Sequence, residues 1–196
     1  VLANTNIYIR KFIEKFLLHE INTPFQTRPS GDYQISSTTF TSLLEVLCGH
    51  KAGDKHLPFF WPNLGKKQLG TLLQAYYDGD GTVGKNGEII ATTKSKQLAT
   101  ELTYALLKIG IWARIQKKWK KATNTNHKGD YYYFVVLSGQ ENLKIFAKYI
   151  NFSLLYKAKR LSKLLEKTSN TNKDIVPNIG KQLFWLRTYL GVSQKE

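Results

Sequence analysis

The chain has 196 residues, enough for one domain or two small ones, and its hydrophobic fraction of 42% suits a folded globule. Lys and Arg number 29 against 14 Asp and Glu, and this formal net charge of +15 calls for a polyanionic partner, nucleic acid first and an anionic membrane surface second. We expect no membrane span, because no apolar run is long enough, and the single cysteine excludes an internal disulfide framework and fits a reducing intracellular compartment, cytoplasmic or organellar.

The first 50 residues predict a helix, a hairpin and a second helix. The first helix is indicated by apolar residues at helical spacing: Ile9, Phe12, Ile13, Phe16 and Leu17. A strand, a Gly31-Asp32 turn, the return strand YQIS and another helix follow. We expect Cys48 to be buried and inert, since Cys48 and His50 alone do not make a zinc site.

The same order returns in the stretch that begins TTKSKQLATEL. Its helix is indicated by Leu98, Leu102, Ala105, Leu106 and Ile109. The strand IWARIQKKWKK, a Gly129-Asp130 turn, the strand YYYFVVL and a second helix follow. This internal duplication predicts an α+β protein of two pseudo-symmetric units, each with helices behind an antiparallel sheet.

The second copy is preceded by KKQLGTLLQAYYDGDGTVGKNGEIIATT, which predicts a helix and a short β-hairpin. Only VLAN precedes the first copy, so we expect a helix and a strand to be missing from its front. The predicted divisions are a first, N-terminally incomplete unit at residues 1–65 and a second unit at residues 66–167. Residues 168–196 would form a polar linker and the start of a small helical module.

Two carboxylates and two glycines stand together in the segment YYDGDGTV, Tyr76 to Val83. A calcium loop of the EF-hand type is excluded, because Val and Ile occupy its positions 6 and 12. We expect Asp80 to fall at the end of a helix that Gly81 terminates, facing the negative end of the helix dipole. A divalent cation would compensate that charge, whereas the alternative reading is a plain Asp-Gly helix stop. Ala75 and Gly79 add a stripe of small residues over which another helix could pack closely.

The nine residues LQAYYDGDG, Leu73 to Gly81, resemble the motif of the LAGLIDADG homing endonucleases, and the duplication over residues 1–167 resembles the two-fold build of that family. The linker and tail look like those of some archaeal intein-encoded members. The resemblance implies saddle-shaped antiparallel sheets in the DNA major groove and two central helices whose terminal acids bind Mg²⁺, with Mn²⁺ as a substitute. Asp80 matches one of these acids, and the second would come from the missing N-terminal segment or from a companion half.

The resemblance also implies a lysine near the metal in each unit. In the first unit DKHLPFFW resembles the corresponding family segment and points to Lys55. In the second unit NFSLLYKAKRL points to Lys157, with Lys159 as the fallback. An ammonium group there would stabilise charge on the scissile phosphate or perturb the attacking water. The alternative for each lysine is an ordinary solvated surface charge.

The predicted hairpin strands carry the DNA-binding argument. In IWARIQKKWKK, Ile111, Ala113 and Ile115 alternate with polar residues, which predicts one apolar and one basic face. Arg and Gln suit base edges and Lys suits phosphates, although a merely solvated sheet face is the alternative. The candidate DNA-binding residues are Gln26, Arg28 and Gln34 in the first unit, and Arg114, Gln116, Lys118, Lys120, Lys121 and Lys128 in the second.

The resulting hypothesis is a sequence-specific, magnesium-dependent endonuclease that cuts both strands of DNA, with Asp80, Lys55 and Lys157 as catalytic residues and Asp80 as metal ligand. The alternative is a LAGLIDADG-type protein that binds DNA or RNA without cutting it, such as a maturase or a regulator. A third reading is protein splicing as part of an intein, for which any splicing residues must lie outside the chain, since it offers Val1 and Glu196.

Overall fold

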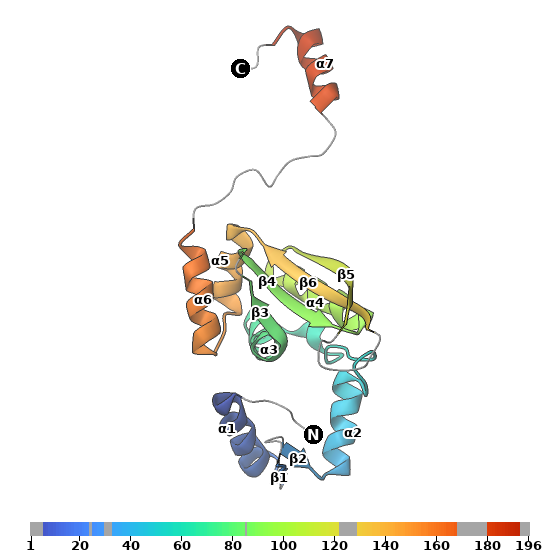
Figure 1. Ribbon diagram of the computed structural model, residues 1–196, viewed down its shortest axis with the longest axis vertical. Coiled ribbons are helices and arrows are strands. Elements are labelled where there is room, and N and C mark those ends of the chain that lie inside the picture. Colours follow the sequence, from blue (N-terminus) through green and yellow to red (C-terminus); the bar gives the residue numbers. More distant parts are fainter. Residues whose placement is uncertain are drawn as a thin grey trace.

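The computed structural model describes residues 6–23, 25–29, 33–84, 86–121, 129–167 and 180–192. Its α+β architecture is organised around a four-stranded antiparallel sheet (Figure 1). The strands are β3 (Gly81–Val83), β4 (Glu88–Thr93), β5 (Ala113–Lys120) and β6 (Asp130–Ser138), in the spatial order β3-β4-β6-β5. The helices α3 (Lys66–Asp80), α4 (Lys96–Ile109), α5 (Gln140–Tyr149) and α6 (Leu155–Leu165) accompany this sheet.

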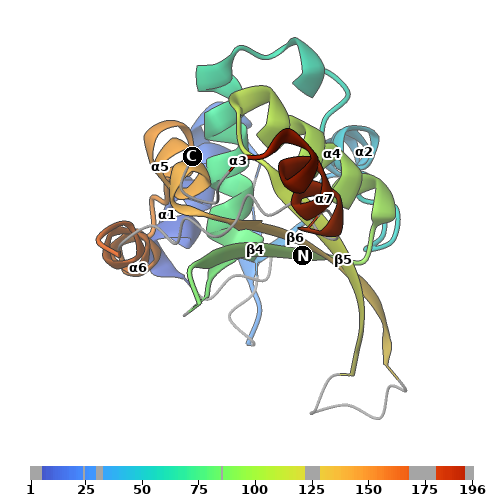
Figure 2. The ribbon, with the colours of Figure 1, turned by 90° about the horizontal axis from the view of Figure 1, so that it is seen from above.

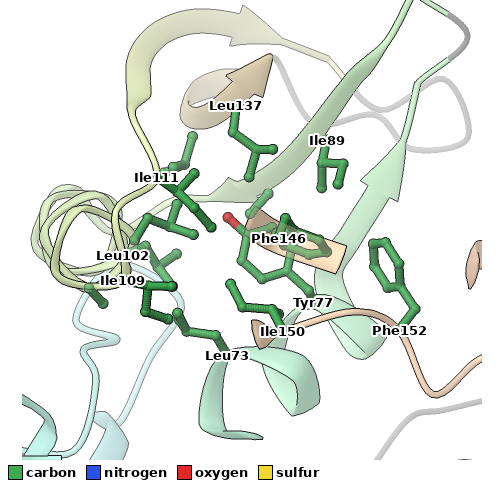
Figure 3. Packing of buried hydrophobic residues seen from close by; sticks show 14 of the residues in the cluster. Leu73, Tyr77, Ile89, Leu102, Ile109, Ile111, Leu137, Phe146, Ile150 and Phe152 are labelled. Carbon is green, nitrogen blue, oxygen red and sulfur yellow. The ribbon is translucent and has the colours of Figure 1, made fainter. Parts of the chain in front are cut away.

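Alternation along the strands explains why the helices gather on one face of the sheet. In β4, Ile89 and Ala91 are fully buried while Glu88, Ile90 and Thr92 are only partly so. Side chains of alternate strand residues point to opposite faces, so Ile89 and Ala91 face α3, α4 and α5. The resulting core gathers large side chains from strands and helices (Figure 3), among them Leu73, Tyr77, Ile89, Leu102, Leu137 and Phe146.

An N-terminal group of elements precedes this core. It comprises α1 (Ile7–Lys15), a π-helical turn at Phe16–Glu20, the two-stranded sheet of β1 (Phe25–Thr27) and β2 (Tyr33–Ile35), and α2 (Thr38–Cys48). Its element order, helix, hairpin, helix, is also that of α4-β5-β6-α5. A 3-10 turn at Trp61–Asn63 leads into α3, and α7 (Gly180–Leu190) stands apart from the sheet and its helices (Figure 1).

The apolar stripe expected on the first helix is present in sequence but only partly buried. Phe12 is 71% exposed and Phe16 42%, whereas Leu17 is buried. Tyr33 in β2 is also buried; its ring packs on Phe25 and its hydroxyl bonds to Arg10 and Glu14. The described part of this group therefore has a small core, and most of the α1 stripe lies outside it.

The hairpin of β5 and β6 runs on beyond the helices (Figure 2). Ile111 is buried and Ala113 half-buried, as alternation predicts, but Ile115 is 41% exposed. The expectation that Ile115 is buried in the core is therefore wrong. Alternation predicts which face of the strand a residue lies on, but it does not predict how far the helix layer extends beneath that face. The same overhang exposes Trp119 and Tyr131, whose rings pack edge to face at 4.9 Å.

Candidate functional site

The two carboxylates at the end of α3 have different surroundings. Asp78 is 6% exposed, and its oxygens accept hydrogen bonds from the Ser153 backbone N–H (3.2 and 3.1 Å), the Ser153 hydroxyl (2.5 Å) and the Leu154 backbone N–H (3.4 Å). Asp80 is exposed and is the last residue of the helix. Of this pair, Asp80 is thus the carboxylate with room for an external ligand.

Position 81, where the helix ends, requires glycine because space is lacking for a side chain. Its φ of −82° and ψ of 145° are ordinary extended values, so no left-handed conformation is needed. A β-carbon at this position would lie 2.7 Å from the Tyr77 ring and close to the Tyr77 carbonyl oxygen, closer than real β-carbons approach. The chain can therefore pass directly from α3 into β3, which leaves Asp80 at a helix–strand junction.

Lys157, in the first turn of α6, supplies the cation at this helix end. Its side chain is buried, and Nζ donates to the carbonyl oxygens of Tyr77 (3.0 Å) and Asp78 (2.7 Å). Burial lowers the pKa of the Lys157 ammonium, while the nearby Asp78 and Asp80 carboxylates oppose that shift. The compensating charge that we expected from a divalent ion is thus already provided in part by a lysine of the same chain.

The other two candidate lysines lie in open positions. Lys159 is exposed on the outer side of α6. Lys55 has an exposed side chain, and its backbone carbonyl accepts from the Ser95 hydroxyl at 2.6 Å. Gly81, the residue after Asp80, pairs with Ala91 of β4, and Ser95 follows Ala91 by four residues. Because Lys55 bonds to Ser95, it stands at the same end of the sheet as Asp80. The catalytic roles of Lys55 and Lys157 stay predictions.

Strand register brings the candidate basic residues of β5 onto one face. Arg114, Gln116, Lys118 and Lys120 pair in turn with Val136, Phe134, Tyr132 and Asp130 of β6. The ammonium groups of Lys118 and Lys120 lie 5.5 and 5.9 Å from the Phe134 ring centroid. Lys121 follows the strand and is exposed, and Lys128 lies outside the described residues. This face is the outer one, opposite the helices.

Acidic residues on this face are paired with basic ones. Arg114 donates to Glu88 at 2.6 Å and to the Ser138 hydroxyl at 3.3 Å, and Lys94 forms an ion pair with Asp130. These pairs are at least partly exposed, so each contributes little stability and can be exchanged for a phosphate contact. Arg114 must leave Glu88 before it can contact DNA with its full guanidinium group.

The candidate residues of the N-terminal group of elements lie on the two-stranded sheet. Gln26 pairs opposite Gln34 across β1 and β2, which places both on one face. Arg28 donates to the Gln34 side-chain oxygen at 2.9 Å. Gln26 and Arg28 are exposed and Gln34 is half-buried, so all three reach the surface.

Two features of the site escaped sequence reasoning. The engagement of Asp78 gives no local signal, because its partners lie 75 residues further along the chain. Trp119, Tyr131 and Lys117 fall on the face that alternation assigns to the core, yet the overhanging hairpin exposes them, with Lys117 Nζ 4.5 Å from the Tyr131 ring centroid. The sequence signal that could have indicated this exposed end is the presence of Trp119 and Tyr131 at the far end of a long predicted hairpin.

A metal at this site would depend on Asp80. Within the described ranges no three His, Cys, Asp or Glu side chains cluster as a metal-binding group. Mg²⁺ is often held by one or two carboxylates together with waters and substrate phosphates, so one exposed Asp80 carboxylate suits it as a partial ligand set.

No helix in the described part of the chain is long and apolar enough to cross a membrane.

Residues 67–151 match the family model of the LAGLIDADG-like domain, which supports the LAGLIDADG family of DNA-binding endonucleases. The chain is also 36% identical over 124 residues to the replication factor C small subunit of Methanocaldococcus jannaschii, a match of 63% of this chain and 6% of that protein. It is 37% identical over 123 residues to the replication factor C small subunit of Thermococcus kodakarensis, a match of 63% of this chain and 13% of that protein. It is 31% identical over 132 residues to the probable translation initiation factor IF-2 of Thermococcus kodakarensis, a match of 67% of this chain and 10% of that protein. The chain therefore spans a small part of the length of these relatives.

Proposed function

We propose that this chain is the nuclease part of a LAGLIDADG-type homing endonuclease, which hydrolyses both strands of a specific DNA site with Mg²⁺. The observation that carries the proposal is Asp80: an exposed carboxylate at the end of the one helix that bears the family motif, next to a sheet with a basic outer face. A net charge of +15 favours DNA as the partner.

The chemistry assigned to Asp80 is metal binding. A bound Mg²⁺ would activate water and polarise the phosphoryl group, and Mn²⁺ would substitute for it. Asp80 supplies a hard oxygen ligand, and Lys157 and Lys55 add positive charge at the same end of the sheet, where charge grows on the scissile phosphate. Waters and DNA phosphates complete the coordination that one carboxylate leaves open.

A second acid belongs to this proposal, from a pseudo-symmetric half formed by an N-terminal segment or by a companion copy. The support is the exposed side of α3 formed by Thr71, Ala75 and Gly79. Beyond its own helix backbone, no described atom lies within 4 Å of a β-carbon built at Gly79, so another helix backbone can approach there. The division into units 1–65 and 66–167, with a tail at 168–196, is part of the same proposal.

Specific recognition is assigned to the outer faces of the two sheets. Arg114 and Gln116 suit base edges in the major groove, as do Gln26, Arg28 and Gln34. Lys118 and Lys120, together with the neighbouring Lys121 and Lys128, suit phosphates. A two-stranded ribbon that overhangs its helices, as β5 and β6 do, has the dimensions to enter a major groove.

The intein-encoded origin is supported by the variety of the relatives. A replication factor subunit and a translation initiation factor have unrelated names, yet about two thirds of this chain matches a small part of each. A segment shared by otherwise unrelated proteins is expected of an inserted element. The names of the relatives therefore do not transfer to this chain.

Cleavage of a plasmid library with random inserts, followed by sequencing of the linear ends, tests the proposal. The full-length protein should linearise a sequence-defined subset in Mg²⁺ or Mn²⁺, and Asp80→Asn should not. The alternative is a DNA- or RNA-binding protein without nuclease activity, favoured by the fact that Asp80 is the only free carboxylate at the described helix end. Tight, salt-sensitive binding without cut ends in either metal would select that alternative.

A further inference from the structure

One face of α3 packs against, and forms hydrogen bonds with, the connection between α5 and α6. Gly70, Gln74 and Asp78 follow each other at four-residue spacing, one helical turn apart. Gly70 lies against the Tyr149 carbonyl, where a β-carbon would be 3.1 Å from the carbonyl carbon and nearer to the oxygen. Gln74 donates to the Ile150 carbonyl at 2.8 Å, and Asp78 accepts from Ser153 and Leu154. Three successive turns thus meet residues 149–154.

The contacts at the last of these turns are reciprocal. Asp78 places its negative charge at the entrance of α6, where the helix dipole is positive and where Leu154, the N-cap residue, offers no side-chain oxygen of its own. Lys157 returns from α6 and donates to the carbonyls of Tyr77 and Asp78, which are among the last carbonyls of α3, where a helix runs out of backbone donors of its own. Each helix therefore satisfies the other's terminal groups.

We propose that Asp78 and Lys157 form a positioning clamp that holds the Asp80 carboxylate in place for metal binding. This role rests on the function proposed above. Asp80 follows Asp78 by two residues and continues the same helical turn, so fraying of that turn would displace its carboxylate. The backbone N–H of Gly81, the residue after Asp80, bonds to the same Tyr77 carbonyl that receives the Lys157 ammonium, which couples the clamp directly to the helix end.

The competing role for Asp78 is that of a second metal ligand two residues before Asp80. The geometry argues against it, because both Asp78 oxygens already accept hydrogen bonds and the residue is 6% exposed. Stripping these bonds to bind a metal would leave the buried Leu154 N–H and the two Ser153 donors without their acceptor, which is unfavourable. Asp78 is thus assigned to positioning and Asp80 to the metal.

Hydrogen exchange of the amides of residues 77–83 tests the clamp without reference to cleavage. The Gly81 amide is the most direct probe, because its acceptor is the Tyr77 carbonyl. Asp78→Asn and Lys157→Met should each accelerate its exchange by about tenfold or more, since local opening of the helix end becomes easier. Lys159→Met, an exposed lysine of the same helix, is the matched control and should leave the rate unchanged. Ser153→Ala, which removes one donor to Asp78, provides a milder variant should Asp78→Asn not fold.

Manganese(II) titration followed by NMR line broadening separates positioning from ligation. Asp78→Asn should retain Mn²⁺ binding within about threefold while cleavage falls by roughly 10- to 100-fold, the loss typical of a misplaced catalytic group. Asp80→Asn should abolish Mn²⁺ binding. Unchanged exchange in both clamp variants, or loss of Mn²⁺ binding in Asp78→Asn as complete as in Asp80→Asn, overturns the inference. If the wild-type protein neither cuts DNA nor binds Mn²⁺, the proposed function fails, while the exchange rates still decide whether the clamp exists.

Discussion

Gly70→Ala should destabilise the protein, although glycine-to-alanine changes within helices usually stabilise. The helix preference of Ala over Gly is worth about 1 kcal/mol. Against it, the new β-carbon would overlap the Tyr149 carbonyl, and α3 must separate from α5 by roughly 1 Å to restore ordinary contact. Overpacking of this kind costs about 1–3 kcal/mol. The separation would also break the 2.8 Å hydrogen bond from Gln74 to Ile150, worth about 1 kcal/mol. The net expectation is a loss of roughly 1–3 kcal/mol.

Gly79→Ala is the matched control on the same helix. Beyond its own helix backbone, a β-carbon at Gly79 has no described atom within 4 Å, so the helix preference should act alone and stabilise the isolated chain by up to about 1 kcal/mol. Urea unfolding followed by circular dichroism measures both changes as shifts in the midpoint at constant slope. A Gly70→Ala protein as stable as the wild type would refute the close approach of α3 to the end of α5.

The remaining predictions concern the core, the acid and the sheet face. Leu102→Ala should lower the free energy of unfolding by about 2–5 kcal/mol, measured in urea, because this fully buried side chain leaves a cavity. Asp80→Asn should leave that free energy and DNA affinity nearly unchanged but abolish cleavage; impaired folding instead would show a structural role. Replacing both Lys118 and Lys120 by Ala should reduce the slope of log K against log salt by about 1.8, from about 0.9 per phosphate contact, measured by filter binding. Glu88→Gln should release Arg114 from its 2.6 Å ion pair and tighten DNA binding; weaker binding would mean that Glu88 orients Arg114 for contact.

Helix and strand positions from α3 to α6 follow from periodicity because their environment is regular. Leu98, Leu102 and Leu106 recur at helical spacing and are all buried against the sheet, as the pattern predicts. The stop of α3 after Asp80 was also predictable, although the reason differs from a typical glycine cap. Gly81 has an extended conformation and is needed because Tyr77 leaves no room for a side chain.

Burial at the edges of the fold was less predictable. The α1 stripe has the same helical spacing as α4, yet Phe12 is exposed, because spacing records a preference for burial and not the presence of a covering surface. Ile115 is exposed for a related reason: its hairpin extends beyond the helices that cover the rest of the sheet. Both cases show that a local pattern identifies a face, while the extent of the neighbouring layer decides whether the face is covered.

The sequence by itself determined the charge that calls for a polyanion, the element order from α3 to α6 and the place of Asp80 at a helix end, since each depends on composition or on residues close together in the chain. Only the tertiary structure distinguished Asp78 from Asp80. The donors that occupy Asp78, and the lysine that neutralises the helix end, come from residues 153–157 and reach α3 because α5 and α6 fold back against it. Hydrogen bonds act over about 3 Å in space, whatever the separation along the chain, so their partners follow from packing and not from the local motif.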